Sequence, residues 1–572
     1  MIGGTAARLP HAARSAAFAV AVLAVLGLVA GCTNTPPPPL VSTSAAVPPP
    51  RPSAGEVVVG VDTIAGGYNP HKLADQSAVT SALTTLLLPS VFRAGPDGVL
   101  RLDGSVMLSA AVTRAEPYTV TYRIRAEASW SDSAPIAAED FVYLRESMRD
   151  QPGVLGAAGY RLITDIASRD GGKVVEVTFA RPYPGWRGLF GGLLPAHLLK
   201  DAPGGWSGAL SSSFPATGGP FSLRTLDHDR GEIVVERNDR YWAEPAVLDR
   251  IVLRRGEIPN IADALRTGHD QLGLAAVDAA GATAFSALGL PLTSVPRPAV
   301  ATLLLRPGGA LAETAARAAV LAAVDRAALI RVGTGGGAGA DRPVDAQVRV
   351  PSDPAYTATR PATAGRSADT LLTEAGYQKV AGLWTRAGEP LRLVVAAPTE
   401  RPGYVAMAEE LRRQLTAAGI EVEVNTPAAA ELFTGPLAVA PAAPGTATRS
   451  SGAVDLAFVP MPAGGDPATD LATRFGCSVD GEGPNARTPT GNPAGVCDVS
   501  VQAVIDSALS GTVPVAETIA ALEPALWSLA VAEPLYQEAD LLAIRPEMSG
   551  VSVGSPLAGP FGGAQFWRKA AS

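Results

Sequence analysis

The sequence predicts a mixed α/β protein of two or three domains, and three observations support this fold class. A strand, a helix and a second strand follow one another from Leu391 to Val424, which indicates a βαβ unit and some parallel sheet. Alternating apolar and polar residues at 119–125 and 174–179 are typical of half-buried strands. The roughly 515 residues after the N-terminal segments exceed the size of one ordinary domain.

The remaining elements can be placed in chain order. The body is expected to open with a strand, Glu56 to Val61, and a helix, Asp75 to Leu87. A helix starting at Ala138 has acidic residues in its first turn, where they favour the helix dipole. The other expected elements are strands at 233–236 and 251–253, an amphipathic helix at 313–332 ended by a glycine run, a helix at 369–376, and the βαβ unit with strand 391–396, helix 404–418 and strand 420–424.

The N-terminus is typical of an exported lipoprotein. Arg8 and Arg14 precede an uncharged apolar stretch, Ala16 to Ala30, which suits a signal peptide and is short for a transmembrane helix. The stretch ends in Val29-Ala30-Gly31-Cys32, which is similar to a bacterial lipobox. We therefore expect residues 1–31 to be a lipoprotein signal peptide and Cys32 to be acylated. The alternative is an uncleaved anchor with an incidental cysteine.

A tether is expected at residues 32–54. Pro36 to Pro39 and Pro48 to Pro50 lie in a segment rich in Pro, Ser and Thr, which stays extended and cannot bury a core. Its position directly after the lipobox favours a tether over a tail without a role.

The charge of the chain excludes some partners. The chain has 46 Lys and Arg against 54 Asp and Glu, and removing a leader with Arg8 and Arg14 leaves ten more acids than bases. An acidic body argues against nucleic acid and against anionic lipid bound by charge.

Cys477 and Cys497 remain as a pair once Cys32 is assigned to the lipid. An even pair in an oxidising compartment predicts a disulfide, which would close a loop rich in Gly and Pro and stabilise the fold by about 3 kcal/mol. A metal or redox pair is the alternative. Its spacing is not that of a CxxC motif, and no His lies nearby.

The matches to catalytic and cofactor motifs lack the sequence context that those motifs require. Gly550 to Gly554 matches the nucleophile elbow, but Pro556 follows where a helix is needed, and no His comes later in the chain. The Gly333-Thr334-Gly335 run follows a helix rather than a strand, so it predicts a helix stop and a loop. The His residues show no metal spacing. We expect no enzyme activity, no metal and no cofactor.

Several stretches resemble motifs of one family, and they occur in the family's order. Trp130 to Phe141 is similar to W-S-D-G-x-P followed by A-E-D-V, and Thr217 to Phe221 is similar to G-T-G-P-Y. Glu236 to Ile251 is similar to R-N-P-x-Y-W followed by L-D-x-I, and Leu371 to Tyr377 to L-L-x-E-A-G-Y. Phe179 to Pro184, Leu194 to His197 and Ala322 to Arg326 also fit. The chain thus resembles the family 5 extracellular solute-binding proteins, the peptide receptors of ABC importers.

This resemblance implies a two-lobed periplasmic-binding-protein-like fold of class C type, with three domains, mixed sheets, hinge closure and an interlobe cleft. The implied domains are lobe 1 (55–88, 216–300 and 540–572), its domain II extension (89–215) and lobe 2 (301–539). The aromatic residues of the motifs, Trp130, Tyr241 and Trp242, are expected to be core or turn anchors rather than ligand contacts.

The resemblance leaves the ligand open. In the family's peptide binders, an Asp that follows a Trp after a strand like Val454 to Phe458 holds the peptide amino terminus. This chain lacks the Trp, and Asp466 is either a displaced counterpart or a solvated turn residue before Pro467. The candidate ligand-binding residues are Tyr68, Asn69, Met461 and Asp466.

Two functions follow from these expectations. The first is a non-catalytic, lipid-anchored receptor of an ABC permease that binds a peptide in the interlobe cleft. The second arises because stretches such as Tyr68 to His71 also resemble a mycobacterial lipoprotein associated with phosphatidylinositol mannoside and lipoarabinomannan synthesis. It is a regulatory lipoprotein that binds a polar-lipid-like ligand or an envelope-biosynthesis enzyme without transport. Both act at the outer face of the membrane, in an actinobacterial-type envelope. An envelope hydrolase ranks last.

Overall fold

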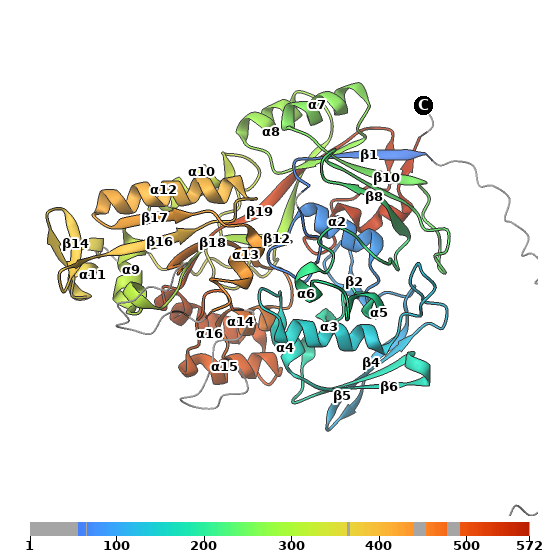
Figure 1. The fold of residues 1–572 in the computed structure, drawn as a ribbon, viewed down its shortest axis with the longest axis horizontal. Helices are drawn as coiled ribbons and strands as arrows, with labels where there is room; N and C mark the ends of the chain where they lie inside the picture. The colour runs from blue at the N-terminus through green and yellow to red at the C-terminus, as the bar shows by residue number, and fades with distance from the viewer. Residues whose placement is uncertain are drawn as a thin grey trace, which may run out of the picture. The chain divides into compact units, whose positions relative to one another are not determined.

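The computed structural model of the chain describes residues 55–64, 66–362, 366–439, 441, 453–477 and 492–570. The described residues form one compact unit (Figure 1). The signal peptide, the lipidation site Cys32 and the tether lie outside the described residues and stay predictions. Within the described part of the chain, no helix has the length and apolar character needed to cross a bilayer.

A mixed ten-stranded sheet runs through the compact unit (Figure 1). Parallel pairs join β1 to β10 and β11, and β16 to β17 and β18, whereas the other neighbours are antiparallel. The strands in spatial order are β17 (Glu421–Asn425), β16 (Arg392–Ala396), β18 (Leu456–Pro462), β12 (Leu292–Leu305), β19 (Ala532–Ile544), β11 (Leu272–Ala275), β1 (Glu56–Val61), β10 (Arg250–Arg255), β9 (Glu232–Arg237) and β8 (Phe221–Asp227).

Two long strands, β12 with 14 residues and β19 with 13, join the two halves of this sheet. The register between them shifts between Pro296 and Val300 and again between Ala301 and Thr302. Pro296 and Pro298 lack the N–H that a ladder hydrogen bond needs, so the break falls where the sequence cannot continue regular pairing. Arg297 lies between these prolines, at the break in the register.

The first lobe comprises β1, β8–β11, the helices that precede β12, and a four-stranded antiparallel sheet in the order β4 (Met107–Ala115), β5 (Tyr118–Ile124), β7 (Val174–Phe179) and β6 (Ile163–Arg169). Its helices are α2 (Ala78–Leu87), α3 (Ala138–Asp150), α4 (Ala157–Arg161), α5 (Ala196–Leu199), α6 (Gly205–Gly208), α7 (Ile258–Thr267) and α8 (Ala279–Ser286). Helix α2 begins three residues later than predicted because Ser77 caps it, accepting a hydrogen bond from Thr80 N.

The start of α3 explains the most specific motif of the sequence. Trp130 is buried, and its indole Nε1 donates to Asp140 Oδ2 at 3.2 Å. The Asp140 carboxylate also accepts hydrogen bonds from the backbone N–H groups of Ala137 and Ala196, each at 3.0 Å. The Trp and the acid therefore fasten the helix start to the core, which confirms Trp130 as a structural anchor.

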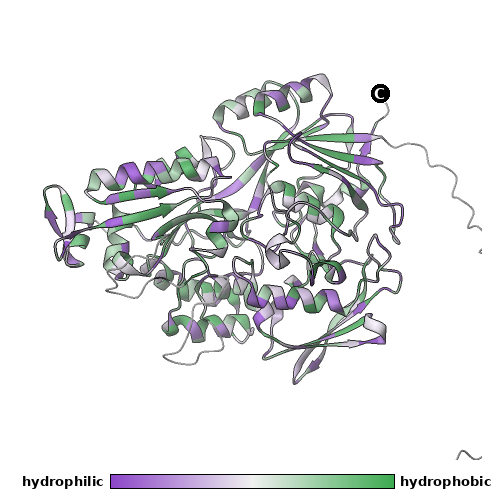
Figure 2. Ribbon diagram, in the orientation of Figure 1, coloured by the Kyte–Doolittle hydropathy of each residue, from purple (hydrophilic) through white to green (hydrophobic). Residues whose placement is uncertain are grey.

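The second lobe comprises β16–β18 with the helices that follow β12. The predicted βαβ unit is confirmed, since β16 and β17 are parallel and helix α12 (Pro402–Ala418) connects them. Gly419, at a φ of 91°, ends α12. Figure 2 shows hydrophobic residues concentrated in the strands beneath this helix. The other helices are α9 (Thr314–Ala322), α10 (Arg326–Thr334), α11 (Ala368–Glu374), α13 (Ala429–Thr434), α14 (Pro467–Phe475), α15 (Val499–Leu509) and α16 (Val515–Ser528).

Smaller elements complete the described fold. The short strands are β2 (Phe92–Ala94), β3 (Leu100–Leu102), β13 (Gln378–Val380), β14 (Leu383–Arg386), β15 (Glu389–Pro390), β20 (Met548–Ser549) and β21 (Arg568–Lys569). The short 3₁₀ helices are η1 (Asp170–Gly172), η2 (Pro184–Gly188), η3 (Gly309–Leu311) and η5 (Pro560–Phe566). The domain boundaries expected from the resemblance stay a prediction.

One expected helix is wrong in extent. The segment 313–332 is not a single helix, because α9 ends at Ala322 and α10 begins at Arg326. Asp325 caps α10, accepting a hydrogen bond from Ala328 N at 3.0 Å. An acid within an apolar periodic stretch was the signal of this break, since Asp favours N-caps over helix interiors.

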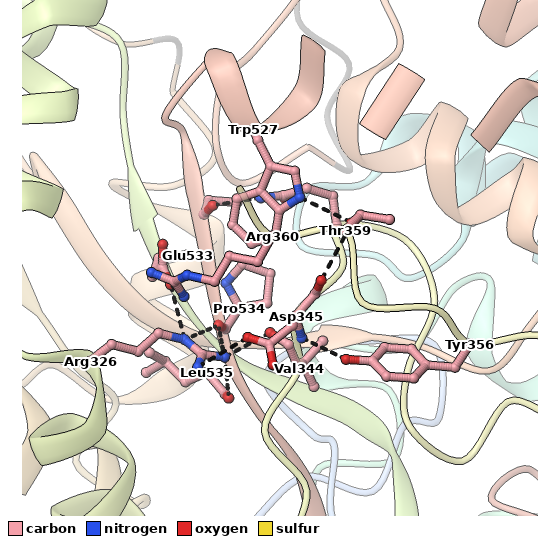
Figure 3. Close-up of polar contacts among 12 residues, drawn as sticks. Arg326, Val344, Asp345, Tyr356, Thr359, Arg360, Trp527, Glu533, Pro534 and Leu535 are labelled. Carbon is pink, nitrogen blue, oxygen red and sulfur yellow. Dashed lines mark hydrogen bonds and ion pairs between the residues drawn. The ribbon is translucent and has the colours of Figure 1, made fainter. Parts of the chain in front are cut away.

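A buried ionic network fixes the segment that follows α10 to the start of β19 (Figure 3). Glu533 is 3% exposed and pairs with Arg326 at 3.0 Å and with Arg360. Arg326 Nη2 also donates to the carbonyl of Val344 at 2.7 Å, and Trp527 Nε1 donates to Thr359 Oγ1 at 3.1 Å. The charges of this network have partners within the fold, so it acts as a structural clamp.

Candidate functional site

A cavity of about 940 Å³ lies between the two lobes. Its volume is at the upper end of the ~300–1,000 Å³ usual for small-molecule sites. The first lobe contributes the end of β1, the loop before α2 and the starts of α7 and α8, and the second lobe contributes the end of α10 and the start of α12. Arg297 of β12 lines its inner part, together with Tyr536, Glu538 and Ala539 of β19. The cavity therefore lies at the junction that the long strands create.

A cluster of buried charges forms the inner part of the cavity. Arg297 Nη2 lies 3.3 Å from Glu538 Oε2, and Arg297 Nε lies 3.5 Å from Asp540 Oδ2. Arg401 Nη1 donates to Glu538 Oε1 at 2.8 Å, and Tyr404 Oη donates to the same oxygen at 2.5 Å. Glu538 is thus held by groups from β12 and α12, and it connects the second lobe to the joining strands.

Burial and neighbouring charges shift the pKa values of the carboxyl groups in this cluster, some upward and one downward from their usual values. Burial would raise the pKa of Glu538, but the Arg297 and Arg401 guanidinium groups outweigh it and hold this pKa at about 2. Burial raises the pKa of Asp540 to about 6 and also raises the pKa of Asp62, although Arg297 acts against both shifts. Burial alone would lower the pKa of Arg297, but the surrounding carboxylates raise it instead. Glu538 and Arg297 are therefore firmly ionised.

One acidic group of the cluster has unused bonding capacity. The Asp62 carboxylate lines the cavity, accepts a hydrogen bond from Ala276 N at 3.2 Å and forms no ion pair within 4.0 Å with any residue that the structure describes. Arg297 Nε, by contrast, is buried beside Asp540 and is not accessible to a ligand. A carboxylate with free acceptor positions in the cavity wall can serve a polar ligand.

The lining carries more acids than bases. Among its described residues, the acids are Asp62, Asp75, Glu257, Asp278, Glu400 and Glu538, and the bases are Arg297 and Arg401. Glu257, Asp278 and Glu400 are exposed and form no ion pair with the described part of the chain. Burial raises the pKa of Asp75 to about 6. The cavity is consequently unfavourable for anionic groups.

The lobes touch next to the cavity. The backbone N–H of Ala279, at the start of α8, donates to the carbonyl of Gly335 at 3.0 Å, and Arg401 donates to the carbonyl of Gln76. Gly335, at a φ of 56°, ends α10, as the glycine run predicted. Each of these contacts joins one lobe to the other beside the cavity.

A second set of interlobe contacts involves the four-stranded sheet domain. Tyr183 Oη lies 2.7 Å from Thr469 Oγ1, and Arg181 Nη2 lies 2.5 Å from Asp506 Oδ1. Tyr183 and Thr469 are both buried. Each of these contacts therefore pairs a polar group of one lobe with a polar group of the other.

The four residues proposed from the sequence do not line this cavity. Tyr68 and Asn69 are fully buried, and Tyr68 stacks on His228 with ring centroids 5.9 Å apart. Met461 is 6% exposed within β18. Asp466 caps α14 and accepts hydrogen bonds from Thr469 N at 2.9 Å and Thr469 Oγ1 at 2.6 Å. Their role in ligand binding stays a prediction.

Sequence reasoning missed Arg297, Arg401 and Glu538. The signal was present, because Gln537, Glu538 and Asp540 stand close together in a strand with many apolar residues and Arg297 stands between two prolines. Charged residues are rarely buried in strands unless they are paired. Their partners, however, come from segments more than 100 residues apart, which periodicity does not connect.

Cys477 and Cys497 form a disulfide in the structure. Cys477 follows α14 and Cys497 precedes α15, so the bond ties together two helices of the second lobe. The residues between 478 and 491 lie outside the described part of the chain.

Comparison with known proteins gives consistent results. Residues 108–482 match the model of the bacterial extracellular solute-binding proteins, family 5. A relative from Mycobacterium tuberculosis, the "Probable monoacyl phosphatidylinositol tetramannoside-binding protein LpqW", is 35% identical over 98% of this chain and 99% of its own length. The oligopeptide-binding protein OppA of the same species is 30% identical but covers 46% of each chain.

A solved structure supports the fold. The periplasmic EDTA-binding protein EppA matches with a TM-score of 0.69 and 23% identity, covering 91% of this chain and 98% of its own. At this identity the likeness establishes the two-lobed fold and carries no information on the ligand.

Proposed function

Because the chain belongs to family 5 of the bacterial extracellular solute-binding proteins, we propose that it binds a solute in the cavity between its lobes and releases it unchanged. The observation that carries this proposal is the ionic cluster of Arg297, Glu538 and Arg401 at the cavity. Buried ion pairs are costly to desolvate and add little net stability. Their concentration in a cavity of about 940 Å³, where the Asp62 carboxylate keeps free acceptor capacity, suits ligand recognition.

The ligand we propose is a mannosylated phosphatidylinositol. One relative is named for binding such a lipid, and its similarity covers nearly the whole chain. The similarity to the oligopeptide-binding relative covers less than half of the chain. A volume of about 940 Å³ accommodates several sugar units rather than one. A peptide is the competing ligand.

The position of the protein follows from its N-terminus. We propose that a lipid on Cys32 and the tether at 32–54 hold the binding body at the outer face of the cytoplasmic membrane. There the body can receive a membrane lipid and present it to an ABC permease or to an enzyme of envelope biosynthesis. A purely regulatory role without a bound ligand is not proposed, since the relatives are named for what they bind.

Isothermal titration of the purified full chain tests the proposal. The probes are deacylated phosphatidylinositol tetramannoside and a mixed library of three- to five-residue peptides. We expect saturable binding of the mannoside with one site, and mass spectrometry of the released ligand should show no chemical change. Saturable binding of peptides without mannoside binding would overturn the ligand assignment, and binding of neither would overturn the cavity site.

The variant Glu538→Gln sharpens this test. It removes the charge to which Arg297 and Arg401 are paired, so the affinity should fall by at least about tenfold, equivalent to 1.4 kcal/mol. Glu517→Gln, at an exposed position of α16, is the matched control and should bind as the native chain does.

A further inference from the structure

We infer that the ligand enters the cavity with its uncharged, hydroxyl-rich end and leaves any phosphate outside. The inference rests on the proposed function and adds an orientation to it. For a mannosylated phosphatidylinositol, the mannose chain would lie inside and the phosphoinositol would stay at the opening.

The outer part of the cavity supports this orientation through its charge. Glu257 and Asp278, at the starts of α7 and α8, and Glu400, before α12, come from both lobes. All three are exposed, and none forms an ion pair with a residue that the structure describes. An anion that passes these three carboxylates is repelled by charges on both lobes, whereas a neutral ligand is not.

The inner part of the cavity offers the complement of a polyol. Asp62 presents a carboxylate with free acceptor capacity in the cavity wall. A vicinal diol can donate its two hydroxyl hydrogens to this carboxylate. A phosphodiester has no hydrogen to donate, and it would be repelled by the Asp62 and Glu538 carboxylates that line the same cavity.

The two arginines are not free to recruit an anion. Arg401 is engaged by Glu538 and by the carbonyl of Gln76, and Arg297 is shared between Glu538 and Asp540. With the charges of both arginines already matched by carboxylates, the cavity has no cationic subsite for phosphate among its described lining residues. The remaining acids leave the lining net negative.

Three probes measured by titration with the full chain test the orientation. They are α-mannotetraose, deacylated phosphatidylinositol tetramannoside, and α-mannotetraose phosphorylated on its non-reducing terminal mannose. We expect the first two to bind within about threefold of each other, because the phosphoinositol stays outside. We expect the third to bind at least about thirtyfold more weakly at low salt, with the gap narrowing as salt screens the charges.

A triple variant and a matched control separate the effect of the lining charges on affinity from the effect of the cavity's shape. The triple variant Glu257→Gln, Asp278→Asn and Glu400→Gln keeps the hydrogen bonds of Asp278 to Gly281 N and of Glu400 to Ala429 N. It should recover about tenfold in affinity for the terminally phosphorylated probe relative to mannotetraose. The control Asp263→Asn, Glu389→Gln and Glu517→Gln removes the same charge from exposed positions outside the lining and should leave this ratio unchanged.

The outcomes distinguish this inference from the proposed function. Equal binding of the terminally phosphorylated probe, or binding of the phosphoinositol mannoside without binding of mannotetraose, would overturn the orientation while keeping the mannoside ligand. Failure of all three probes would overturn the mannoside ligand itself.

Discussion

Gly337 of the second lobe lies so close to Val277 of the first that a Cβ added at Gly337 would stand 1.6 Å from the Val277 carbonyl oxygen. A real Cβ cannot occupy that position, so only glycine permits this approach of the two lobes. The same loop accepts the interlobe hydrogen bond from Ala279 to Gly335. The glycine run is therefore more than a helix stop, since its lack of side chains lets the cavity close.

Gly337→Ala is expected to hold the lobes apart. Because the methyl group must displace backbone rather than a flexible side chain, closure should become unfavourable and ligand affinity should fall by at least about tenfold, or 1.4 kcal/mol. Small-angle scattering should report a larger radius of gyration. Gly188→Ala is the control, because nothing lies within 4 Å of its added Cβ. Native affinity and an unchanged radius in Gly337→Ala would contradict the role of this contact.

Glu533→Gln is expected to destabilise the second lobe. The change removes a buried charge while leaving Arg326 and Arg360 without their shared partner (Figure 3). Breaking such a buried pair costs about 3–5 kcal/mol. Urea unfolding measures the loss, and Glu389→Gln on an exposed strand is the control. A loss of less than about 1 kcal/mol in the free energy of unfolding would mean that the network stabilises the fold no more than surface ion pairs do.

Removing the disulfide is expected to destabilise the fold by about 3 kcal/mol in the chain-entropy model. The double variant Cys477→Ser and Cys497→Ser opens a loop that spans 20 residues of sequence separation. Because the bond ties α14 to α15, and α14 carries Thr469 of the interlobe contact, ligand affinity should also weaken. Calorimetry with and without reductant checks the result, and a reductant effect that persists in the double variant would contradict this origin.

The sequence predicted local features better than the site. Trp130 and Asp140 are ten residues apart, and their contact belongs to one motif, so the motif identified both the helix start and the fold. The βαβ unit was likewise predictable, because its periodicity and its Gly419 stop lie within one segment. Local patterns of this kind follow from helix and strand propensities and from the capping residues at helix ends.

The cavity was not predictable in the same way. Arg297 and Glu538 are 241 positions apart, and they meet only because β12 and β19 pair across the molecule. The four ligand residues proposed from the sequence lie outside the lining of this cavity, and their role in ligand binding stays a prediction. The site depends on the pairing of strands that are far apart in the sequence, and the periodicity of the sequence carries no information about that pairing.

The stability of the protein is expected to depend on pH in an unusual direction. Burial raises the pKa of Asp75, Asp140, Asp470 and Asp540 to about 6 each. Unfolded carboxyls titrate near ~3.9. Between these values the folded chain binds more protons than the unfolded chain, so the stability from these groups is present at low pH and is lost as pH rises through about 6.

Buried His71 acts in the opposite direction, because burial lowers its pKa to about 4 and its neutral form favours folding at higher pH. Four carboxyls outweigh one imidazole, so the Tm should be higher at pH 5 than at pH 7. Asp470→Asn should narrow this difference because it removes one of the four titrations, while Asp263→Asn, with a side chain that is 71% exposed, should preserve it. Differential scanning calorimetry of the full chain at both pH values measures the two Tm values. A Tm that rises from pH 5 to pH 7 would mean that these carboxylates are ionised and solvated in the folded protein, contrary to their burial.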